Sequence, residues 1–395
     1  MIETNFKHTD IGVIPHDWEV KKLGAIYSFR YGIGNTNPNN GGKYPIYGAN
    51  GVIGGYSKYN AEDSIVIGHM GEYAGSVLWA EGKHFVTYNG TITRPKEENS
   101  INAKYGFYAL LKLNINNICA GSGYPFLAYD KLNSLKIPLP PTLAEQEKIA
   151  NALSKIDQLI NDLGVLIEKK KAIKQGTMQD LLTAKRRLKG CTGKWIEKTI
   201  EELGILTGAG VDKKSSEDET PIRLVNYLDV FKRDYIFQKE LDFWVTANEG
   251  KKHQCNVLKG DIFFTPSSEM PYDIALSALA MEDMPNVCYS YHIYRLRLNE
   301  DIDFLYRAYM FKSDSFYSQA NQTCEGSGKR YVISLSKFKQ MTVTYPSSKK
   351  EQRAIANVLS SMDTEITNLE QKRDKYIAIK QGMMQNLLTG KIRLI

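Results

Sequence analysis

The residues that most often do chemistry on nucleotides or nucleic acids lack, in this sequence, the spacing that their reactions need. There is no G-x-x-x-x-G-K-[ST] loop to hold the phosphates of ATP, and Gly32-Ile-Gly34 lacks the third glycine of a dinucleotide-binding turn. Asn37-Pro38 is not followed by the Pro-aromatic pair of an amino-methylating site, so we interpret it as a turn. These patterns predict a chain that catalyses no reaction by itself.

The sequence gives no support for metal or redox chemistry either. The six histidines form no H-x-x-x-H or H-E-x-x-H pattern. The five cysteines are far apart and never form a C-x-x-C pair: Cys119, Cys191, Cys255, Cys288 and Cys324. Such thiols indicate a reduced, cytoplasmic protein and argue against a disulfide framework or a zinc site. We therefore expect no metal and no cofactor in this chain.

The composition is that of a globular protein with room for two or three domains. Hydrophobic residues make up 42% and charged residues 24% of the 395 residues. There is no run of eighteen apolar residues and the segment Met1–Asp10 is polar, so we expect neither a membrane span nor a secretory signal. The formal net charge of +7 is only a weak hint of a polyanionic partner.

Two glycine-rich segments carry residue types that suit contact with DNA. Such contact needs cations for phosphates and planar or amide groups for base edges, and glycines let a backbone approach closely. These features occur together in Gly121-Ser122-Gly123-Tyr124 and in Gly326-Ser327-Gly328-Lys329-Arg330-Tyr331. The alternative is a structural turn before a strand, which is the simpler explanation of the glycines alone. Recurrence of the pattern favours a shared framework that carries different contact residues.

Further candidates for DNA contact lie in loops beside glycines or in comparable surroundings. In the first half they are Tyr47, Asn50, Tyr56, His69 and Tyr73, and in the second half Ser267, Ser268, Tyr291 and His292. The chain has 24 tyrosines, so many of them must belong to the core. The basic run 185–189 is a further candidate for phosphate contact, and its alternative role is to complement the end of a helix.

The elements that position these segments follow from an internal repeat. Glu145–Leu188 recurs as Glu351–Leu394, 206 residues later and without a gap, with 24 identities in 44 positions. The regions before each copy differ in length and sequence, so the chain alternates variable and constant segments. Gly176 and Gly382 fall at matched positions of the two copies, where we expect a bend or a close approach.

The constant segments are predicted to be long helices that pair with each other. Apolar residues alternate spacings of four and three, as in the seam of a coiled coil. In the first copy they are Ile149, Leu153, Ile156, Ile160, Leu163 and Ile167, and the second copy repeats the stripe until Arg373. We expect an intramolecular antiparallel coiled coil with a pseudo-two-fold axis. The alternative is that each helix packs only on its own domain.

The variable segments are predicted to be mixed α/β domains with short strands, which makes the whole chain α+β. Asn50-Gly51 is typical of a hairpin turn, and residues 63–67 and 261–264 are predicted to be buried strands. The predicted division of the chain is a first recognition domain at 1–141, a helical region at 142–190, a second recognition domain at 191–346 and a helical region at 347–395.

These motifs together resemble the specificity subunits of type I restriction–modification systems, the HsdS family. The resemblance rests on Pro140-Pro141 with Glu145-Gln146, on the Lys174–Leu182 run, on their second copies, on the opening at Trp18 with Leu23-Gly24, and on Tyr44–Gly51. It covers essentially the whole chain. One departure is that the second variable segment has no counterpart of Tyr-Pro-x-Tyr-Gly, so its contact surface is harder to place.

The resemblance implies a division of labour among subunits. Each recognition domain would bind one half of an asymmetric, interrupted DNA site, and the helices would set the gap and dock two modification subunits. Those partners would bind S-adenosylmethionine and methylate adenine, and two restriction subunits would use ATP and Mg to move along DNA and cut it. Half-sites about one helical turn apart, roughly 34 Å, would suit such a two-fold arrangement.

Two other classes of function remain open from the sequence. A coiled-coil scaffold whose variable domains bind proteins would explain the helices, but not a constant framework beside domains that have diverged. A stand-alone methyltransferase or nuclease would need motifs that this sequence lacks. Binding of duplex DNA that ignores ionic strength would favour the scaffold.

Overall fold

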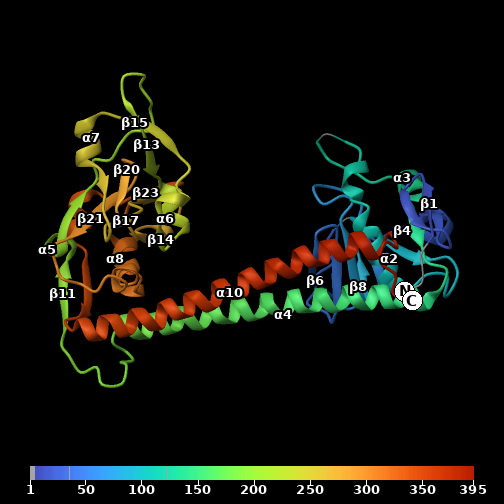
Figure 1. Ribbon diagram of the computed structural model, residues 1–395. Coiled ribbons are helices and arrows are strands. Elements are labelled where there is room, and N and C mark those ends of the chain that lie inside the picture. Colours follow the sequence, from blue (N-terminus) through green and yellow to red (C-terminus); the bar gives the residue numbers. More distant parts are fainter. Residues whose placement is uncertain (1–4, 35, 122) are drawn as a thin grey trace. The chain divides into compact units, whose positions relative to one another are not determined.

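The chain consists of two compact units in the computed structural model, which describes residues 5–34, 36–121 and 123–395 (Figure 1). Unit 1 comprises Met1–Val165 with Glu370–Ile395, and unit 2 comprises Leu166–Leu369. The two long helices, α4 (Leu143–Leu182) and α10 (Lys349–Leu387), each contribute residues to both units. Within the described ranges, every helix is too short or too polar to cross a membrane.

Unit 1 is organised around a six-stranded sheet with the order β4-β9-β7-β8-β5-β6, in which only β5 and β8 are parallel. Its elements before α4 are β1 (Phe6–Thr9), β2 (Gly12–Pro15), β3 (Glu19–Lys22), α1 (Leu23–Ile26), β4 (Tyr27–Tyr31), β5 (Tyr44–Gly48), β6 (Gly51–Tyr56), β7 (Ala61–Gly68), β8 (Val77–Val86), β9 (Gly90–Pro95), α2 (Ala103–Lys112), η1 (Ile115–Ile118), α3 (Tyr129–Ser134) and β10 (Lys136–Leu139). The central strand β7 is buried because Ile65, Val66 and Ile67 pack on both faces. The predicted Asn-Gly hairpin and the strand at 63–67 are confirmed.

Unit 2 contains a five-stranded sheet, β12-β21-β17-β19-β14, and a four-stranded sheet, β15-β13-β20-β16. Its elements between the long helices are β11 (Trp195–Thr199), α5 (Ile200–Leu203), β12 (Gly204–Thr207), β13 (Thr220–Val225), α6 (Tyr227–Lys232), β14 (Tyr235–Ile236), η2 (Gln238–Glu240), β15 (Trp244–Ala247), α7 (Glu249–Gln254), β16 (Asn256–Val257), β17 (Ile262–Phe264), β18 (Ser267–Ser268), η3 (Pro271–Asp273), β19 (Ser277–Ala280), β20 (Met284–Tyr289), β21 (Tyr294–Leu298), η4 (Tyr306–Ala308), α8 (Asp314–Thr323), β22 (Glu325–Ser327), β23 (Arg330–Val332), α9 (Leu335–Gln340) and β24 (Thr342–Pro346). The strand predicted at 261–264 is β17.

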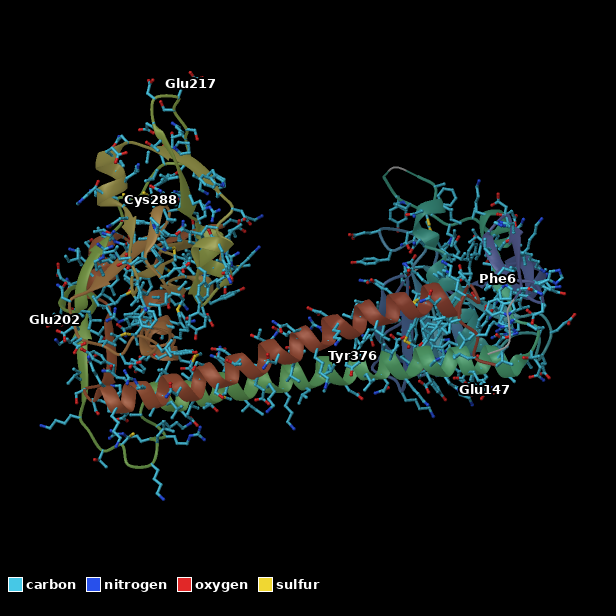
Figure 2. All side chains as sticks on the ribbon, in the orientation of Figure 1. Phe6, Glu147, Glu202, Glu217, Cys288 and Tyr376 are labelled. Atoms are coloured by element: carbon cyan, nitrogen blue, oxygen red, sulfur yellow. The ribbon has the colours of Figure 1, made fainter. Side chains whose placement is uncertain are left out.

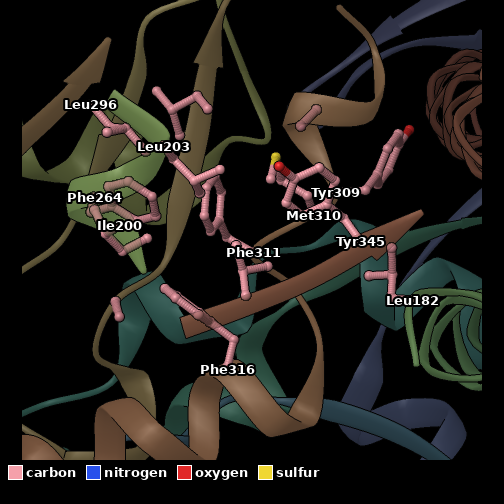
Figure 3. Close-up of a cluster of buried hydrophobic side chains, with 14 of the residues drawn as sticks. Leu182, Ile200, Leu203, Phe264, Leu296, Tyr309, Met310, Phe311, Phe316 and Tyr345 are labelled. Carbon is pink, nitrogen blue, oxygen red and sulfur yellow. The ribbon is translucent and has the colours of Figure 1, made fainter. Parts of the chain in front are cut away.

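The core of each unit includes residues from both long helices. In unit 1, Ile149 and Leu153 of α4 pack in the same cluster as Leu387 of α10 and Trp18. In unit 2, Leu182 of α4 joins a cluster with Phe264, Phe311 and Phe316 (Figure 3), to which Ile355 and Leu359 of α10 also belong. The apolar stripe therefore serves both the helix pair and the domain core.

The helices run antiparallel in both units, as predicted. In unit 1 the Lys380 Nζ of α10 lies 2.6 Å from Asp157 Oδ1 of α4, and Arg393 pairs with Glu145. In unit 2 the repeat-related pairs are Lys174 with Asp363 and Arg187 with Glu351. Early residues of one helix thus meet late residues of the other, with the roles of the two copies exchanged between the units.

The Glu-Gln motif of each copy fixes the domain to its helix. Gln146 Oε1 accepts a hydrogen bond from Asn102 N at 2.8 Å, and its Nε2 donates to Pro140 O at 3.1 Å. The equivalent Gln352 accepts from Asp303 N at 2.7 Å and donates to Pro346 O at 2.8 Å. Both glutamines are buried, so these bonds explain why each copy keeps the motif.

One expectation about the helical regions needs correction. The bend or close approach predicted at Gly176 and Gly382 is wrong, because both glycines lie inside uninterrupted helices and a Cβ added at either would meet open space. In the basic run 185–189, for which two roles were open, Arg187 holds the buried Glu351 and donates to Gly193 O at 2.8 Å. Arg393 does the same for Glu145.

Candidate nucleic-acid interface

In unit 1 the loop after the central strand β7 packs against the glycine-rich segment predicted from the sequence. Met70 and Phe126 form an antiparallel bridge, and Gly71 N donates to Pro125 O at 2.8 Å. Leu127 N donates to His69 O at 2.9 Å and closes the arrangement. We call residues 69–75 with 121–126 the unit 1 loop pair. Ser122, one of the predicted contacts, lies outside the described residues.

Exposed aromatic rings project from the unit 1 loop pair. Tyr124 is 60% exposed, and Tyr73 and Phe126 are also exposed. Gly121 has φ +100°, and a Cβ there would lie 2.9 Å from Tyr124 O, so this position requires glycine. Gly123 is exposed, with open space around it. The glycines therefore let the backbone turn so that Tyr124 faces solvent.

His69 lies beneath this surface. Its ring centroid is 3.8 Å from that of Tyr31, with Tyr88 against its edge, and Tyr129 stacks on Tyr31 at 4.1 Å. Its Nδ1 donates to Leu127 O at 3.0 Å, since a carbonyl only accepts. Burial lowers the pKa of His69, and the hydrogen bond to Leu127 O partly opposes this by raising the pKa. His69 therefore supports the exposed residues from below. It packs against Tyr31 and Tyr88, and sequence reasoning missed both of them as well as Tyr129.

The other predicted residues of unit 1 lie on the β5–β6 hairpin. Asn50 is exposed at the hairpin turn. Ser76, which follows residues 69–75 of the loop pair, donates from its Oγ to Ala49 O at 2.5 Å and so joins this turn to the loop pair. Tyr47 packs its ring against His84 and Tyr56 packs against Phe85. Only Asn50 of these three predicted contacts is therefore exposed beside the loop pair.

Unit 2 builds the same arrangement from different residues. After β17, Ser267 and Ser268 in β18 pair with Val332 and Tyr331 in β23, and β22 completes a three-stranded sheet. Ile333 N donates to Pro266 O at 2.8 Å, as Leu127 N donates to His69 O in unit 1, and the two donors lie 206 residues apart, at the offset of the repeat. We call residues 265–273 with 325–332 the unit 2 loop pair.

Cations replace aromatic rings in the second glycine-rich segment. Lys329 and Arg330 are exposed, and Tyr331 is half-buried. Gly326 has φ +139°, and a Cβ there would lie 2.0 Å from Arg330 O. Gly328, also at positive φ, and Ser327 complete the exposed turn. The framework is shared between the units, and the exposed side chains differ.

A second segment of unit 2 lies close to Arg330. Tyr291 is exposed, and its ring centroid lies 3.9 Å from that of His292, with the two rings tilted by 35°. Burial lowers the pKa of His292, and the nearby positive charges of Lys213 and Arg330 lower it further. The negative charge of Asp212 acts in the opposite direction and raises this pKa. The backbone of Val211 bonds to Tyr289 and Tyr291, which holds Lys213 there.

Sequence reasoning missed two exposed residues, Tyr272 within the unit 2 loop pair and Lys213 in the segment that Val211 holds beside Tyr291. Tyr272 is 65% exposed and stands three residues after Glu269, beyond β18, whereas Tyr73 directly follows Glu72 in the loop after β7. That shared Glu and Tyr after a buried strand is the signal that would have found it. Among the residues that the structure describes, no three His, Cys, Asp or Glu side chains are grouped to hold a metal ion.

Two units that each present a loop pair beside a constant helical framework define a class of two-domain recognition proteins. The chain matches the family described as "Type I restriction modification DNA specificity domain" twice, over residues 15–175 and 193–378. These matches cover most of the sequence. The chain belongs to this family, the specificity subunits of type I restriction–modification systems.

Similar proteins match either the whole chain or a part of it. The MjaVIII specificity subunit of Methanocaldococcus jannaschii is 25% identical over 418 residues, which covers 99% of this chain and 97% of the relative. The EcoprrI specificity subunit of Escherichia coli is 33% identical over 122 residues, 30% of this chain and 29% of the relative. The crystal structure of the S subunit from M. genitalium has a TM-score of 0.62 at 17% identity, with 98% of both chains covered, and shows that the fold is shared.

Proposed function

We propose that this chain is the DNA-binding specificity subunit of a type I restriction–modification complex, in which each unit binds one half of a bipartite, asymmetric site. The observation that carries the proposal is the equivalent loop pair in the two units. Matched backbone hydrogen bonds at Leu127 and Ile333 hold frameworks of the same kind, yet Tyr124 is exposed in one and Arg330 in the other. A constant frame with different exposed groups suits two readers of different sequences.

The exposed groups suit contact with base edges and phosphates. Arg330 can donate two parallel hydrogen bonds to the O6 and N7 of a guanine, and Lys329 can neutralise a phosphate. Tyr73 and Tyr124 offer a hydroxyl and an apolar ring face, which suit a base edge or a thymine methyl group. The glycines have no side chain, so the backbone of each loop pair can approach the duplex closely.

The helices would set the gap between the half-sites and dock the partners. Ile173 and Ile379 are related by the repeat, and both are exposed on the helices, at 46% and 40%. An exposed isoleucine at the same position of both copies suits two identical partners, each covering one copy. We infer that these partners are modification subunits that carry S-adenosylmethionine, and that restriction subunits supply ATP- and Mg-dependent cleavage. This chain would supply recognition in the cytoplasm and no catalysis.

Mapping methylated adenines in DNA from cells that express the chain with its modification subunit tests the proposal. We expect a bipartite site in which Arg330→Ala relaxes or weakens one half only, and Tyr124→Ala the other half only. A lost base contact costs about 1–3 kcal/mol, or roughly 5- to 150-fold in affinity for that half. Tyr59→Ala, an exposed tyrosine away from the loop pair, is the control. Changes in both halves from one substitution would refute the assignment.

A further inference from the structure

The outer face of β13 and β15 in unit 2 carries a tryptophan ring that lies in solvent, and a second exposed ring, that of Phe243, directly precedes β15. Trp244 is 56% exposed and Phe243 beside it is also exposed, whereas Trp18, Trp79 and Trp195 are buried or half-buried. Trp244 pairs across the strands with Arg223, one position beyond the buried pair of Ile222 and Val245. Strand alternation therefore directs Trp244 and Arg223 away from the core.

Each of the two exposed rings has a cation over it. The Arg223 guanidinium carbon lies 5.1 Å from the centre of the Trp244 ring, and Lys213 Nζ lies 5.7 Å from the centre of the Phe243 ring. Arg223 Nη1 also donates to Gln238 O at 2.8 Å, which fixes its position. Such contacts orient the cation on one face of the ring and leave its other hydrogen-bond donors available.

These two cations are not neutralised by carboxylates in the described part of unit 2, where no ion pair within 4 Å involves Arg223 or Lys213. By contrast, Arg233 and Arg297 each pair with an aspartate. Among the carboxylates of this region, Glu219 bonds to Thr246 and Asn248. Figure 2 shows Glu217 at the tip of the loop between β12 and β13. Asp212 and Asp242 are exposed next to Lys213 and Phe243 in the sequence.

Lys213 links the exposed rings to the segment beside the unit 2 loop pair. Tyr291 N donates to Val211 O at 3.1 Å, which holds the segment of Lys213 beside Tyr291 and His292, and the positive charges of Lys213 and Arg330 both act on His292. Lys213 also lies over Phe243, which directly precedes Trp244 in the sequence, and Arg223 lies over Trp244. We call these last four residues the Trp244 strip.

We propose that the Trp244 strip binds the duplex that flanks the half-site contacted by the unit 2 loop pair. This inference rests on the proposed function. Arg223 and Lys213 would each contact a backbone phosphate, and the exposed indole would lie against a deoxyribose, where no base is read. The link through Lys213 to the segment beside the loop pair, together with the unpaired cations, favours a duplex over a protein partner, which would have to cover isolated positive charge. Unit 2 would therefore contact more DNA than its half-site.

Binding of the full chain to duplexes of graded length tests the proposal. The half-site of unit 2 is first identified as the one that Arg330→Ala alters, and flanking DNA is then removed from that side in steps of two base pairs. Wild type is expected to lose about five- to tenfold in affinity when the flank is removed. Trp244→Ala should bind the long duplex about that much more weakly and no longer depend on the flank, while Trp244→Phe should retain most of the dependence.

Two further readouts separate a phosphate contact from a structural effect. Arg223→Gln should reduce the slope of log affinity against log salt concentration by about one. DNA should quench the tryptophan fluorescence of wild type more than that of Trp244→Phe. The control is Tyr59→Ala, which removes an exposed ring with Lys83 over it at 4.8 Å in unit 1, and which should leave the flank dependence unchanged.

The outcomes distinguish this proposal from the proposed function. A wild-type chain that bound no duplex would overturn both. Specific binding by wild type that Trp244→Ala leaves unchanged on every duplex would overturn this proposal alone. Normal DNA binding with loss of subunit assembly in Trp244→Ala would also overturn it, in favour of a protein occupant of the strip.

Discussion

The ion pair between Arg393 and Glu145 is expected to be worth more than any surface ion pair of the chain. The Glu145 side chain is only 4% exposed, and the guanidinium binds both of its oxygens, with Nη2 at 2.8 Å from Oε2. Arg393 also donates to both oxygens of Asp17 at 2.9 and 3.0 Å. Its guanidinium carbon lies 5.6 Å from the centre of the Trp18 ring.

Arg393→Met keeps the apolar stem and removes the charge, which leaves Glu145 as a buried carboxylate without a cation. Breaking a pair in this way costs about 3–5 kcal/mol of stability. The lost ion pair with Asp17 adds little to this cost, because more than half of the Asp17 side chain is exposed to solvent. We expect the free energy of unfolding of unit 1 to fall by that amount. The double variant Glu145→Gln with Arg393→Met should recover most of the loss, because no buried charge remains.

Urea unfolding followed by tryptophan fluorescence measures this effect, since Trp18 lies beside the substituted residue. The matched experiment is Arg187→Met in unit 2, where Glu351 is 2% exposed and the same bidentate pair forms at 2.9 and 2.6 Å. A loss below about 1 kcal/mol, or a double variant as unstable as the single one, would refute the argument that these pairs hold the helix ends to each unit.

Three further expectations concern pH, partner docking and the recognition loops. Burial lowers the pKa of His84 and His69, so the unfolded chain takes up protons near pH 6.5 that folded unit 1 does not. The stability of unit 1 should therefore fall as pH drops below 6.5, by up to about 1.4 kcal/mol per pH unit for each histidine. Urea midpoints that stay constant from pH 7.5 to 5.5 would contradict this. Ile173→Glu and Ile379→Glu should each remove one of two modification subunits from the complex, as native mass spectrometry would show, and a single variant that still binds two would exclude the docking model. Gly326→Ala should weaken DNA binding about tenfold, because its Cβ would collide with Arg330 O and displace that residue. Gly176→Ala, at a helical glycine in open space outside the loop pairs, is the control, and equal binding by both variants would count against a role for Arg330.

The helical framework could be predicted from the sequence because its information is local and periodic. Residues such as Leu153 and Ile160 lie seven residues apart within one copy, and the fixed offset of 206 between the copies gives each stripe a matching partner. The prediction at Gly176 and Gly382 was wrong because a helical glycine needs a close neighbour only where another backbone approaches, and none does here. Periodicity predicts which face is apolar, and it does not show what that face packs against.

The candidate interface could be predicted only in part. The glycine-rich segments stood out because two positive-φ glycines, Gly121 and Gly326, are needed where backbone carbonyls come close. Their partner loops could not be assigned, because the bridge of Met70 with Phe126 joins residues that are far apart in the sequence. Lys213 was missed for the same reason, because its segment bonds to Tyr289 and Tyr291 through the backbone of Val211.

The sequence by itself determined that the chain has two copies of one helical frame, each attached to a different domain, because periodicity and repetition are properties of the residues in order. Only the tertiary structure decided that Arg187 and Arg393 neutralise buried glutamates rather than face solvent, and that Trp244 is exposed while Trp18 is buried. The physical reason is that desolvation depends on which distant segments pack together, and a residue's type states only what its burial or exposure would cost.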